Sequence, residues 1–353
     1  MAPLPTRTVA AGAGGDTGPA GFHVIDGSVA AEVIAADPDA VVDLVRDTYL
    51  WHDAGRTVNP NSYFLRFPDR PDARIIALPA HLGGPEAVSG LKWIASYPSN
   101  VARNLQRASA VLILNDAETG YPFACLEASR ISAARTAASA ALAVEALAPS
   151  PEPRRVLFVG AGVIGRTVSD FLAARGLAVE EAMVYDHVDG YAAKFAGYLG
   201  ERHGWAASVA EDVDEAMAAA ELVILATTAP APWLCQEQTL RPEQLILNLS
   251  LRDVHPTVMI RCQNILDDVE HCMTAGTSPQ LTEIEYGHRN FLDGTLADVL
   301  NGAVKADPNR TTVFSPFGLG VLDLALGAHV HRVAVAQGRA TSIPGFFPDV
   351  ARW

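Results

Sequence analysis

Residues 156–176, VLFVGAGVIGRTVSDFLAARG, decide the fold of this chain. The apolar run at 156–159 predicts a buried parallel strand, and the residues that follow show the periodicity of an amphipathic helix. Between them stand three glycines in the pattern G-x-G-x-x-G, namely Gly160, Gly162 and Gly165. Glycines at this spacing let the backbone turn sharply and approach a pyrophosphate, which free N–H groups at the helix N-terminus then bind. The stretch therefore predicts a Rossmann unit that holds a dinucleotide.

Asp186 selects the dinucleotide. It ends a second apolar run at the spacing where an acidic residue hydrogen-bonds the ribose hydroxyls. A carboxylate there repels a 2′-phosphate, so the sequence favours NAD over NADP. We expect Val163 and Ile164, at the start of the helix, to line the same site. Thr227 directly follows another predicted strand and is a further expected cofactor contact.

The length of 353 residues predicts two domains. Five short apolar runs, each separated from the next by a helical segment, predict a parallel sheet; they are 156–159, 182–185, 222–226, 245–248 and 264–266. We expect a Rossmann NAD-binding domain over 151–319. A β-rich substrate domain over 22–150 plus 320–353 is expected to be discontinuous, because a long apolar helix from Gly320 should return to it. The fold class is α/β.

The first part of the chain carries other patterns. Strands are expected at 22–26, 62–67, 73–80 and 90–98, a helix at 41–52, a hairpin at 110–127 and an alanine-rich helix at 129–147. The segment SPEP (150–153) should end that helix and act as a linker. Residues 1–21 are rich in Gly, Ala and Pro without an apolar core, which predicts a disordered leader.

Composition narrows the class of protein. The net charge of −14 argues against nucleic acid or a membrane surface as a partner, and no apolar stretch reaches the ~18 residues that span a bilayer. The four cysteines show no C-x-x-C spacing, and Cys262 with His271 and Cys272 makes a poor zinc pattern. We therefore expect a cytoplasmic protein with reduced cysteines and no structural metal.

Three basic residues of the first part could bind a small anionic substrate. Arg66 and Lys92 lie in predicted strands, and Arg135 lies among small residues in the alanine-rich helix. Two guanidinium groups and one ammonium group would clamp a carboxylate, as in an amino acid, and the ammonium group of Lys92 could also act catalytically by polarising a neighbouring C–N bond. The alternatives remain open that the strand residues lie on a solvated face and that Arg130 takes the place of Arg135.

Three motifs carry a family resemblance: GLKWIASYPSN (90–100), the D-x-x-T-G-x-P turn (116–122) and ARTAASAALA (134–143) ahead of the glycine loop. Together they resemble the ornithine cyclodeaminase/mu-crystallin superfamily, over about residues 22–340. The resemblance implies a β-domain that forms homodimers and a Rossmann domain. It also implies a nicotinamide-dependent enzyme that oxidises amino acids or reduces imines.

The resemblance also assigns roles to residues. Lys92 and Arg135 would grip the substrate carboxylate, with Arg66 as a further, less secure, match. Asp253, in NLSLRDVHP (248–256), would be the catalytic aspartate that activates water, although a turn or cap aspartate is the alternative. His255 could orient it but is more typical of a structural residue, and Asp323 is expected to cap a helix or to lie behind the substrate-binding groups.

Two segments favour one branch of the superfamily. WHDAGRTVNPNSYFLRF (51–67) and SLRD (250–253) are more similar to the 2,3-diaminopropionate biosynthesis dehydrogenases of siderophore and peptide-antibiotic pathways than to the cyclodeaminases, which carry a Gly-Gly-Asp type segment. This similarity implies oxidation of the secondary amine of N-(2-amino-2-carboxyethyl)-L-glutamate to 2,3-diaminopropionate and 2-oxoglutarate. Arg252 could bind an additional carboxylate of that substrate, or it is a surface arginine.

Two other functions stay open. One is an ornithine cyclodeaminase or another amino-acid or ketimine dehydrogenase. The other is a non-enzymatic binding protein of mu-crystallin type, against which the presence of Lys92, Arg135 and Asp253 argues.

Overall fold

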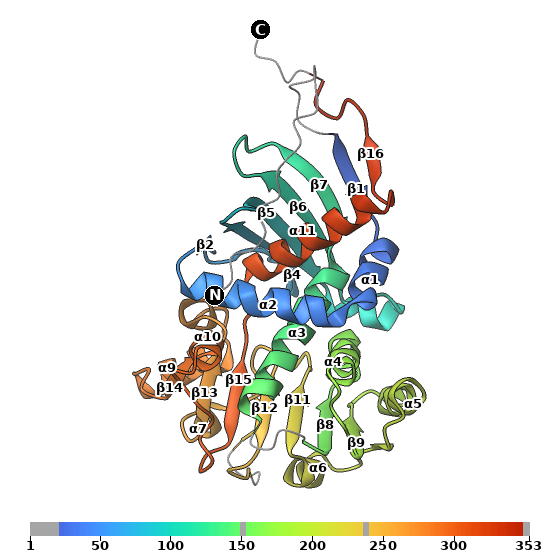
Figure 1. Ribbon diagram of the computed structural model, residues 1–353. Helices are drawn as coiled ribbons and strands as arrows, with labels where there is room; N and C mark the ends of the chain where they lie inside the picture. Colours follow the sequence, from blue (N-terminus) through green and yellow to red (C-terminus); the bar gives the residue numbers. More distant parts are fainter. Residues whose placement is uncertain (1–20, 149–152, 236–239, 349–353) are drawn as a thin grey trace.

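The computed structural model describes residues 21–148, 153–235 and 240–348. Two eight-stranded sheets form the upper and lower parts of the molecule, and helices lie between them (Figure 1). The expected α/β class is confirmed. The expected leader, up to residue 20, and most of the SPEP linker lie outside the described residues. No helix of the described chain has the length and apolarity needed to cross a membrane.

The second sheet is parallel throughout, in the order β10-β9-β8-β11-β12-β15-β13-β14. Its strands are β8 (Arg155–Val159), β9 (Glu181–Tyr185), β10 (Ala207–Val209), β11 (Leu222–Leu225), β12 (Leu245–Asn248), β13 (Gln263–Leu266), β14 (Leu292–Thr295) and β15 (Thr312–Ser315). The central strands are apolar runs buried along their whole length, as helices on both faces require. The Rossmann prediction is confirmed.

One prediction for this sheet is wrong. A helix was expected between each pair of strands, yet the described residues of 226–244 contain none. Leu234 instead forms a single parallel bridge with Val254, which ties this connection to the segment after β12. The edge strands β10 and β14 were not predicted, because they are short and partly exposed.

The first sheet has the order β16-β1-β7-β6-β5-β4-β2, with β3 paired to β4. Its strands are β1 (Phe22–Ile25), β2 (Thr57–Val58), β3 (Tyr63–Phe67), β4 (Arg70–Leu82), β5 (Val88–Ser96), β6 (Ala108–Asp116), β7 (Pro122–Glu127) and β16 (Thr341–Ile343). The expected hairpin is present, and its turn is closed by Thr119 N–H donating to Asp116 Oδ1 at 2.7 Å. Near its end the chain returns to this sheet, where β16 pairs antiparallel with β1.

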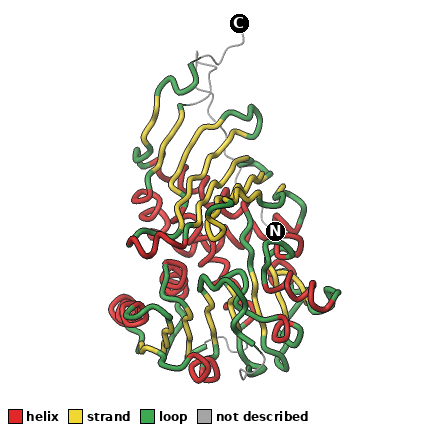
Figure 2. The backbone as a smooth tube through the Cα atoms, turned by 180° about the vertical axis from the view of Figure 1, so that it is seen from behind, coloured by secondary structure: helices red, strands yellow, loops and turns green. Residues whose placement is uncertain are grey.

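Helices cover one face of the first sheet and both faces of the second. They are α1 (Gly27–Ala36), α2 (Pro38–Asp53), α3 (Ser129–Leu147), α4 (Val163–Ala174), α5 (Tyr191–His203), α6 (Val213–Ala219), α7 (Pro256–Met259), α8 (Val269–Cys272), α9 (Ser278–Tyr286), α10 (Leu296–Leu300), α11 (Gly320–Ala336) and the 3₁₀ helix η1 (Pro98–Arg103). Seen from behind, the strands of the first sheet lie in front of its helices (Figure 2). The helix expected from Gly320 is α11, and it packs on β4, β5 and β6. The division at 150 and 320 into two domains remains our interpretation of these two sheets.

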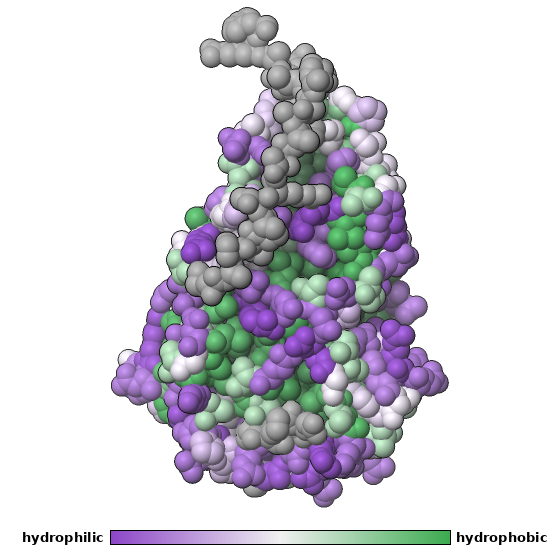
Figure 3. Space-filling model, in the orientation of Figure 1, coloured by the Kyte–Doolittle hydropathy of each residue, from purple (hydrophilic) through white to green (hydrophobic). Residues whose placement is uncertain are grey.

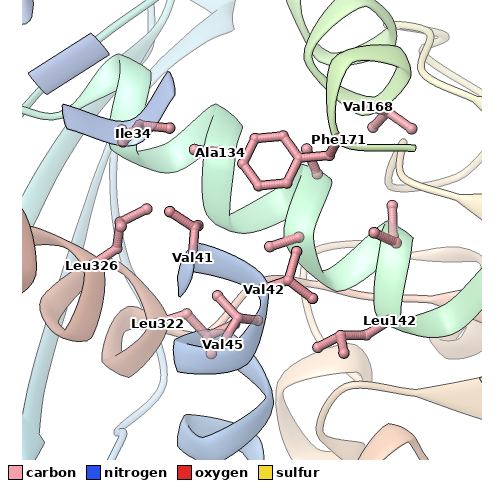
Figure 4. Close-up of a cluster of buried hydrophobic side chains, with 14 of the residues drawn as sticks. Ile34, Val41, Val42, Val45, Ala134, Leu142, Val168, Phe171, Leu322 and Leu326 are labelled. Atoms are coloured by element: carbon pink, nitrogen blue, oxygen red, sulfur yellow. The ribbon is translucent and has the colours of Figure 1, made fainter. Parts of the chain in front are cut away.

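Helix α3 joins the two parts. Thirteen of its 19 residues are buried, because alanines let the helix approach its neighbours closely. Ala134 of α3 faces Phe171 of α4, while valines of α2 and leucines of α11 close the other sides (Figure 4). One continuous apolar cluster therefore runs through both sheets' helices. Figure 3, in the orientation of Figure 1, shows apolar residues among hydrophilic ones in the middle of the molecular surface.

Candidate active site

The glycine loop connects β8 to α4. Gly160 has φ +101°, and a Cβ there would lie 2.6 Å from the carbonyl oxygen of Ala226, so that only glycine fits. Gly165 is buried, with its Cβ position 3.0 Å from the Gly160 oxygen. The loop is therefore held tightly against the carboxyl end of β11.

The start of α4 can receive a phosphate. Its N-cap, Gly162, offers no side-chain hydrogen bond, and a Cβ on it would point into open space. The N–H groups of Val163 and Ile164 thus begin the helix beside an open approach. This cradle fits a pyrophosphate.

Asp186 lies directly beyond β9, next to the loop. Its Oδ2 accepts a hydrogen bond from Ala161 N–H and its Oδ1 from Val188 N–H, both at 2.8 Å. The carboxylate thus stands at the edge of the glycine loop, where a ribose would lie. The donor and acceptor set fits NAD.

Lys92 and Arg135, predicted from separate segments, come together around a buried carboxylate. Lys92 Nζ of β5 donates to Asp323 Oδ2 at 2.6 Å and to Ser132 Oγ at 3.1 Å. Arg135 Nε of α3 lies 3.4 Å from Asp323 Oδ1. All three charged side chains are at most 10% exposed. We call this group the buried clamp.

Of the two roles expected for Asp323, the structure agrees with the second, in which it lies behind the substrate-binding groups. The N-cap of α11 is Leu319, which makes no side-chain bond. Asp323 lies in the first turn of α11 and balances the two cations. Burial, together with the nearby Arg135 guanidinium, lowers the pKa of Lys92 to about 8, while Asp323 opposes this shift. Lys92 can therefore change its charge near neutral pH.

The loop between β15 and α11 packs against the clamp. A side chain on Gly318, whose φ is +98°, would collide with the Arg135 guanidinium. Asp267, at the end of β13, accepts hydrogen bonds from the N–H groups of Phe317 at 2.9 Å and Gly318 at 2.6 Å. The second sheet thus positions the backbone against which Arg135 lies.

Asp253 is fully buried beyond the end of β12. Its Oδ1 accepts a hydrogen bond from Thr227 Oγ1 at 2.6 Å, and its Oδ2 has no partner among the described residues. Burial raises the pKa of Asp253, and the nearby polar side chains of Ser250 and Thr227 oppose the rise. Within the described chain Asp253 makes no hydrogen bond to Lys92 or Arg135, so its role as a base stays a prediction.

The structure places the other predicted residues as follows. Thr227 holds Asp253, and its contact with a cofactor remains a prediction. His255 caps α7 by accepting from Thr257 N–H and makes no hydrogen bond to Asp253. Arg130 is exposed. Arg252 is half-buried, and its Nη2 donates to Ala275 O at 3.0 Å.

Arg66 lies outside the clamp. It is exposed on β3, with its guanidinium 5.0 Å from the centre of the Phe64 ring, and it pairs with Arg74 of β4. Sequence reasoning missed Asp267, although it lies directly beyond a predicted strand of the parallel sheet, and Gly318, which lies in the loop after β15.

Comparisons with known proteins agree with this architecture. The model of the ornithine cyclodeaminase/mu-crystallin family matches residues 32–338. The N-((2S)-2-amino-2-carboxyethyl)-L-glutamate dehydrogenase of Staphylococcus aureus is 32% identical over 311 residues, which are 86% of this chain and 92% of that protein.

Solved structures share the whole fold. The crystal structure of CmnK is 27% identical with a TM-score of 0.83, over 92% of this chain and 98% of that one. The Δ1-pyrroline-2-carboxylate reductase of Thermococcus litoralis, solved with NADH and L-proline, has a TM-score of 0.84 at 23% identity, over 91% of this chain and 100% of that one.

Proposed function

The chain belongs to the ornithine cyclodeaminase/mu-crystallin family, and from this premise we propose that it is an NAD-dependent dehydrogenase that cleaves N-(2-amino-2-carboxyethyl)-L-glutamate. The observation that carries the proposal is the buried clamp: Lys92 and Arg135 meet in the interior, where a small carboxylate can be bound without water. The dehydrogenase from Staphylococcus aureus, similar over most of both chains, supports this choice of substrate.

The reaction balances with water and one oxidant. The bond between the glutamyl α-carbon and its hydrogen breaks, and the C–N bond becomes an imine. Water then adds to the imine carbon, and the C–N bond breaks to release 2-oxoglutarate and 2,3-diaminopropionate. One NAD⁺ is reduced to NADH, and one proton is released.

The chain's residues bind the substrate and move protons. When bound, NAD supplies the hydride acceptor. Arg135 and Lys92 hold the glutamyl α-carboxylate. The same two cations also bind Asp323, so both carboxylates interact with them. Asp253 takes a proton from the attacking water, and the rise in its pKa on burial makes it a stronger base. Thr227 fixes the orientation of its carboxylate.

The proposal is tested by NADH absorbance. The purified protein with NAD and the glutamate–diaminopropionate adduct should form NADH and 2-oxoglutarate, whereas ornithine, alanine and glutamate should give far slower turnover. Proline and ammonia from ornithine would favour a cyclodeaminase. NADH binding without turnover of any amino acid would favour a binding protein.

A homodimer is part of the proposal. Strand register places Val24, Tyr63, Leu65, Trp93 and Val111 on the face of the first sheet opposite its helices. Each is more than a third exposed, and together they form an apolar surface that suits a second copy of the chain. Trp93→Glu should shift the protein from dimer to monomer in light scattering, while exposed Tyr286→Glu on α9 should not.

A further inference from the structure

Four arginines lie near one another where β4 pairs with β3 and with the end of β5. They come from β3, from β4, from the residue before β6 and from the loop after β12, and we call them the arginine cluster: Arg66, Arg74, Arg107 and Arg252. Arg66 pairs with Arg74 across β3 and β4, and Arg74 pairs with Ser96 across β4 and β5. Arg107 Nη1 donates to Ser96 Oγ at 2.7 Å, so three of the four surround one point of the sheet.

Arg252 reaches the same place from the second sheet. Burial lowers the pKa of Arg74, and the positive charges of Arg107, Arg252 and Arg66 lower it further. Arg74 is therefore close enough to interact electrostatically with the other three arginines of the cluster. The cluster crosses the junction between the two sheets, as a site for a small molecule does in such a fold.

The cluster lacks a counter-ion. In the described part of the chain none of its members forms an ion pair with a carboxylate, although ten other arginines do. Like charges held together in a half-buried place repel one another, and a bound anion removes that cost.

The cluster and the buried clamp share one face of the sheet. Arg74 and Leu78 lie on the same side of β4, since side chains alternate along a strand, and Leu78 pairs with Lys92. Arg74 and Leu78 are four residues apart along β4, so their Cα atoms are separated by roughly 13 Å. The side chains of Arg74 at one end and Lys92 at the other, together with a short dicarboxylate bound between them, are long enough to span this distance.

We propose that the arginine cluster is a second carboxylate site, which binds the γ-carboxylate of the glutamyl moiety while Lys92 and Arg135 hold its α-carboxylate. This inference rests on the proposed function. It explains how the enzyme selects a substrate with several carboxylates over alanine or ornithine, which leave the cluster without an anion. Arginine suits this task because its planar fork binds carboxylates in two places.

The test compares two ligands in the presence of NADH by calorimetry. Pyruvate carries only the α-carboxylate, whereas 2-oxoglutarate carries an α-carboxylate and a γ-carboxylate. The wild-type protein should bind 2-oxoglutarate about ten- to a hundredfold more tightly than pyruvate. Arg74→Gln should remove most of that preference and leave the affinity for pyruvate unchanged. Arg202→Gln, the same change on the exposed end of α5, should behave as the wild type.

The outcomes separate the two proposals. A wild-type protein without the preference, or an Arg74→Gln protein that keeps it, overturns the second carboxylate site, whatever the adduct does. A preference that depends on Arg74, in a protein that forms no NADH from the adduct, supports the site and overturns the proposed reaction. Normal NADH binding verifies the fold of Arg74→Gln. If that variant does not fold, Arg107→Gln is expected to lose the same preference, and retention there overturns the site.

Discussion

The hydroxyl of Thr227 opposes the rise that burial causes in the pKa of Asp253. Its hydrogen bond to Oδ1, at 2.6 Å, stabilises the charged carboxylate against burial. In Thr227→Val that bond is lost and the pKa of Asp253 should rise further. We expect the acidic limb of the kcat/KM profile to move upward by about half to one pH unit, since a hydrogen bond of about 1 kcal/mol corresponds to that shift.

Thr227→Ser is the matched control, because it keeps the hydroxyl and should leave the limb in place. An unmoved limb in Thr227→Val would show that Asp253 is not the group that titrates there.

If Lys92 binds the substrate carboxylate as proposed, it should give an alkaline limit to substrate binding. Its pKa of about 8 means that the free enzyme loses this positive charge as the pH rises through that value. The Kd of the NADH complex for pyruvate should therefore increase between about pH 7 and 9. Calorimetry across this range measures the change.

Lys92→Met provides the comparison. Its Kd should be high at every pH, without an inflection near 8. An inflection that persists in this variant would assign the titration to another group.

At the scale of elements, the loop between β15 and α11 sets the position of Arg135. In Gly318→Ala the new methyl group collides with the guanidinium. We expect KM for the substrate to rise about tenfold or more, which equals a loss of about 1.4 kcal/mol of binding, with a smaller change in kcat. Steady-state kinetics and NADH titration measure the two effects.

Gly338→Ala separates strain from the collision. Gly338 also has positive φ, at +67°, but nothing lies within 4 Å of its Cβ position. This variant should lose stability through strained backbone alone and keep its KM. A similar KM in both variants would contradict the role of the loop.

The elements differ in how far the sequence could predict them. The glycine loop was predictable, because βαβ geometry places Gly160 and Asp186 together through local spacing. Lys92 and Arg135 were predicted as a pair through the family resemblance. Asp323 was not recognised as their counter-ion, because it lies far along the chain on α11. Arg66 lies outside the clamp because the β3–β4 register, which a sequence does not show, pairs it with Arg74.

At the scale of the whole molecule, an ionic contact connects the two sheets' units. Asp268, before α8, accepts from His52 of α2 at 3.1 Å and from His271 at 3.0 Å. His271 Nε2 in turn lies 2.9 Å from Asn59 Nδ2. Burial would raise the pKa of Asp268, but the two histidines hold it well below its usual range. For His271, burial lowers the pKa but the bond to Asp268 prevails and raises it.

These shifts define a pH window. The contribution of Asp268 is complete above 3.8 and is lost as the pH falls, whereas that of His271 is complete below 6.5 and is lost as the pH rises through its raised pKa. The Tm difference between the wild type and Asp268→Asn should therefore be largest between these values and shrink above 6.5. Differential scanning calorimetry at several pH values measures it. Asp43→Asn, which removes an exposed pair with Arg46, should leave Tm nearly unchanged.

Helix α3 has a consequence for how such proteins can diversify. Its alanines face α4 on one side and α2 on another. The helix therefore fits the helices of both sheets, although it precedes the second sheet in the chain. A recombination event that replaced the cofactor-binding half alone would leave the old alanine surface against a foreign helix. We therefore expect that exchange of the cofactor-binding half alone would destabilise the protein, unless the residues of α3 that contact α4 were exchanged with it.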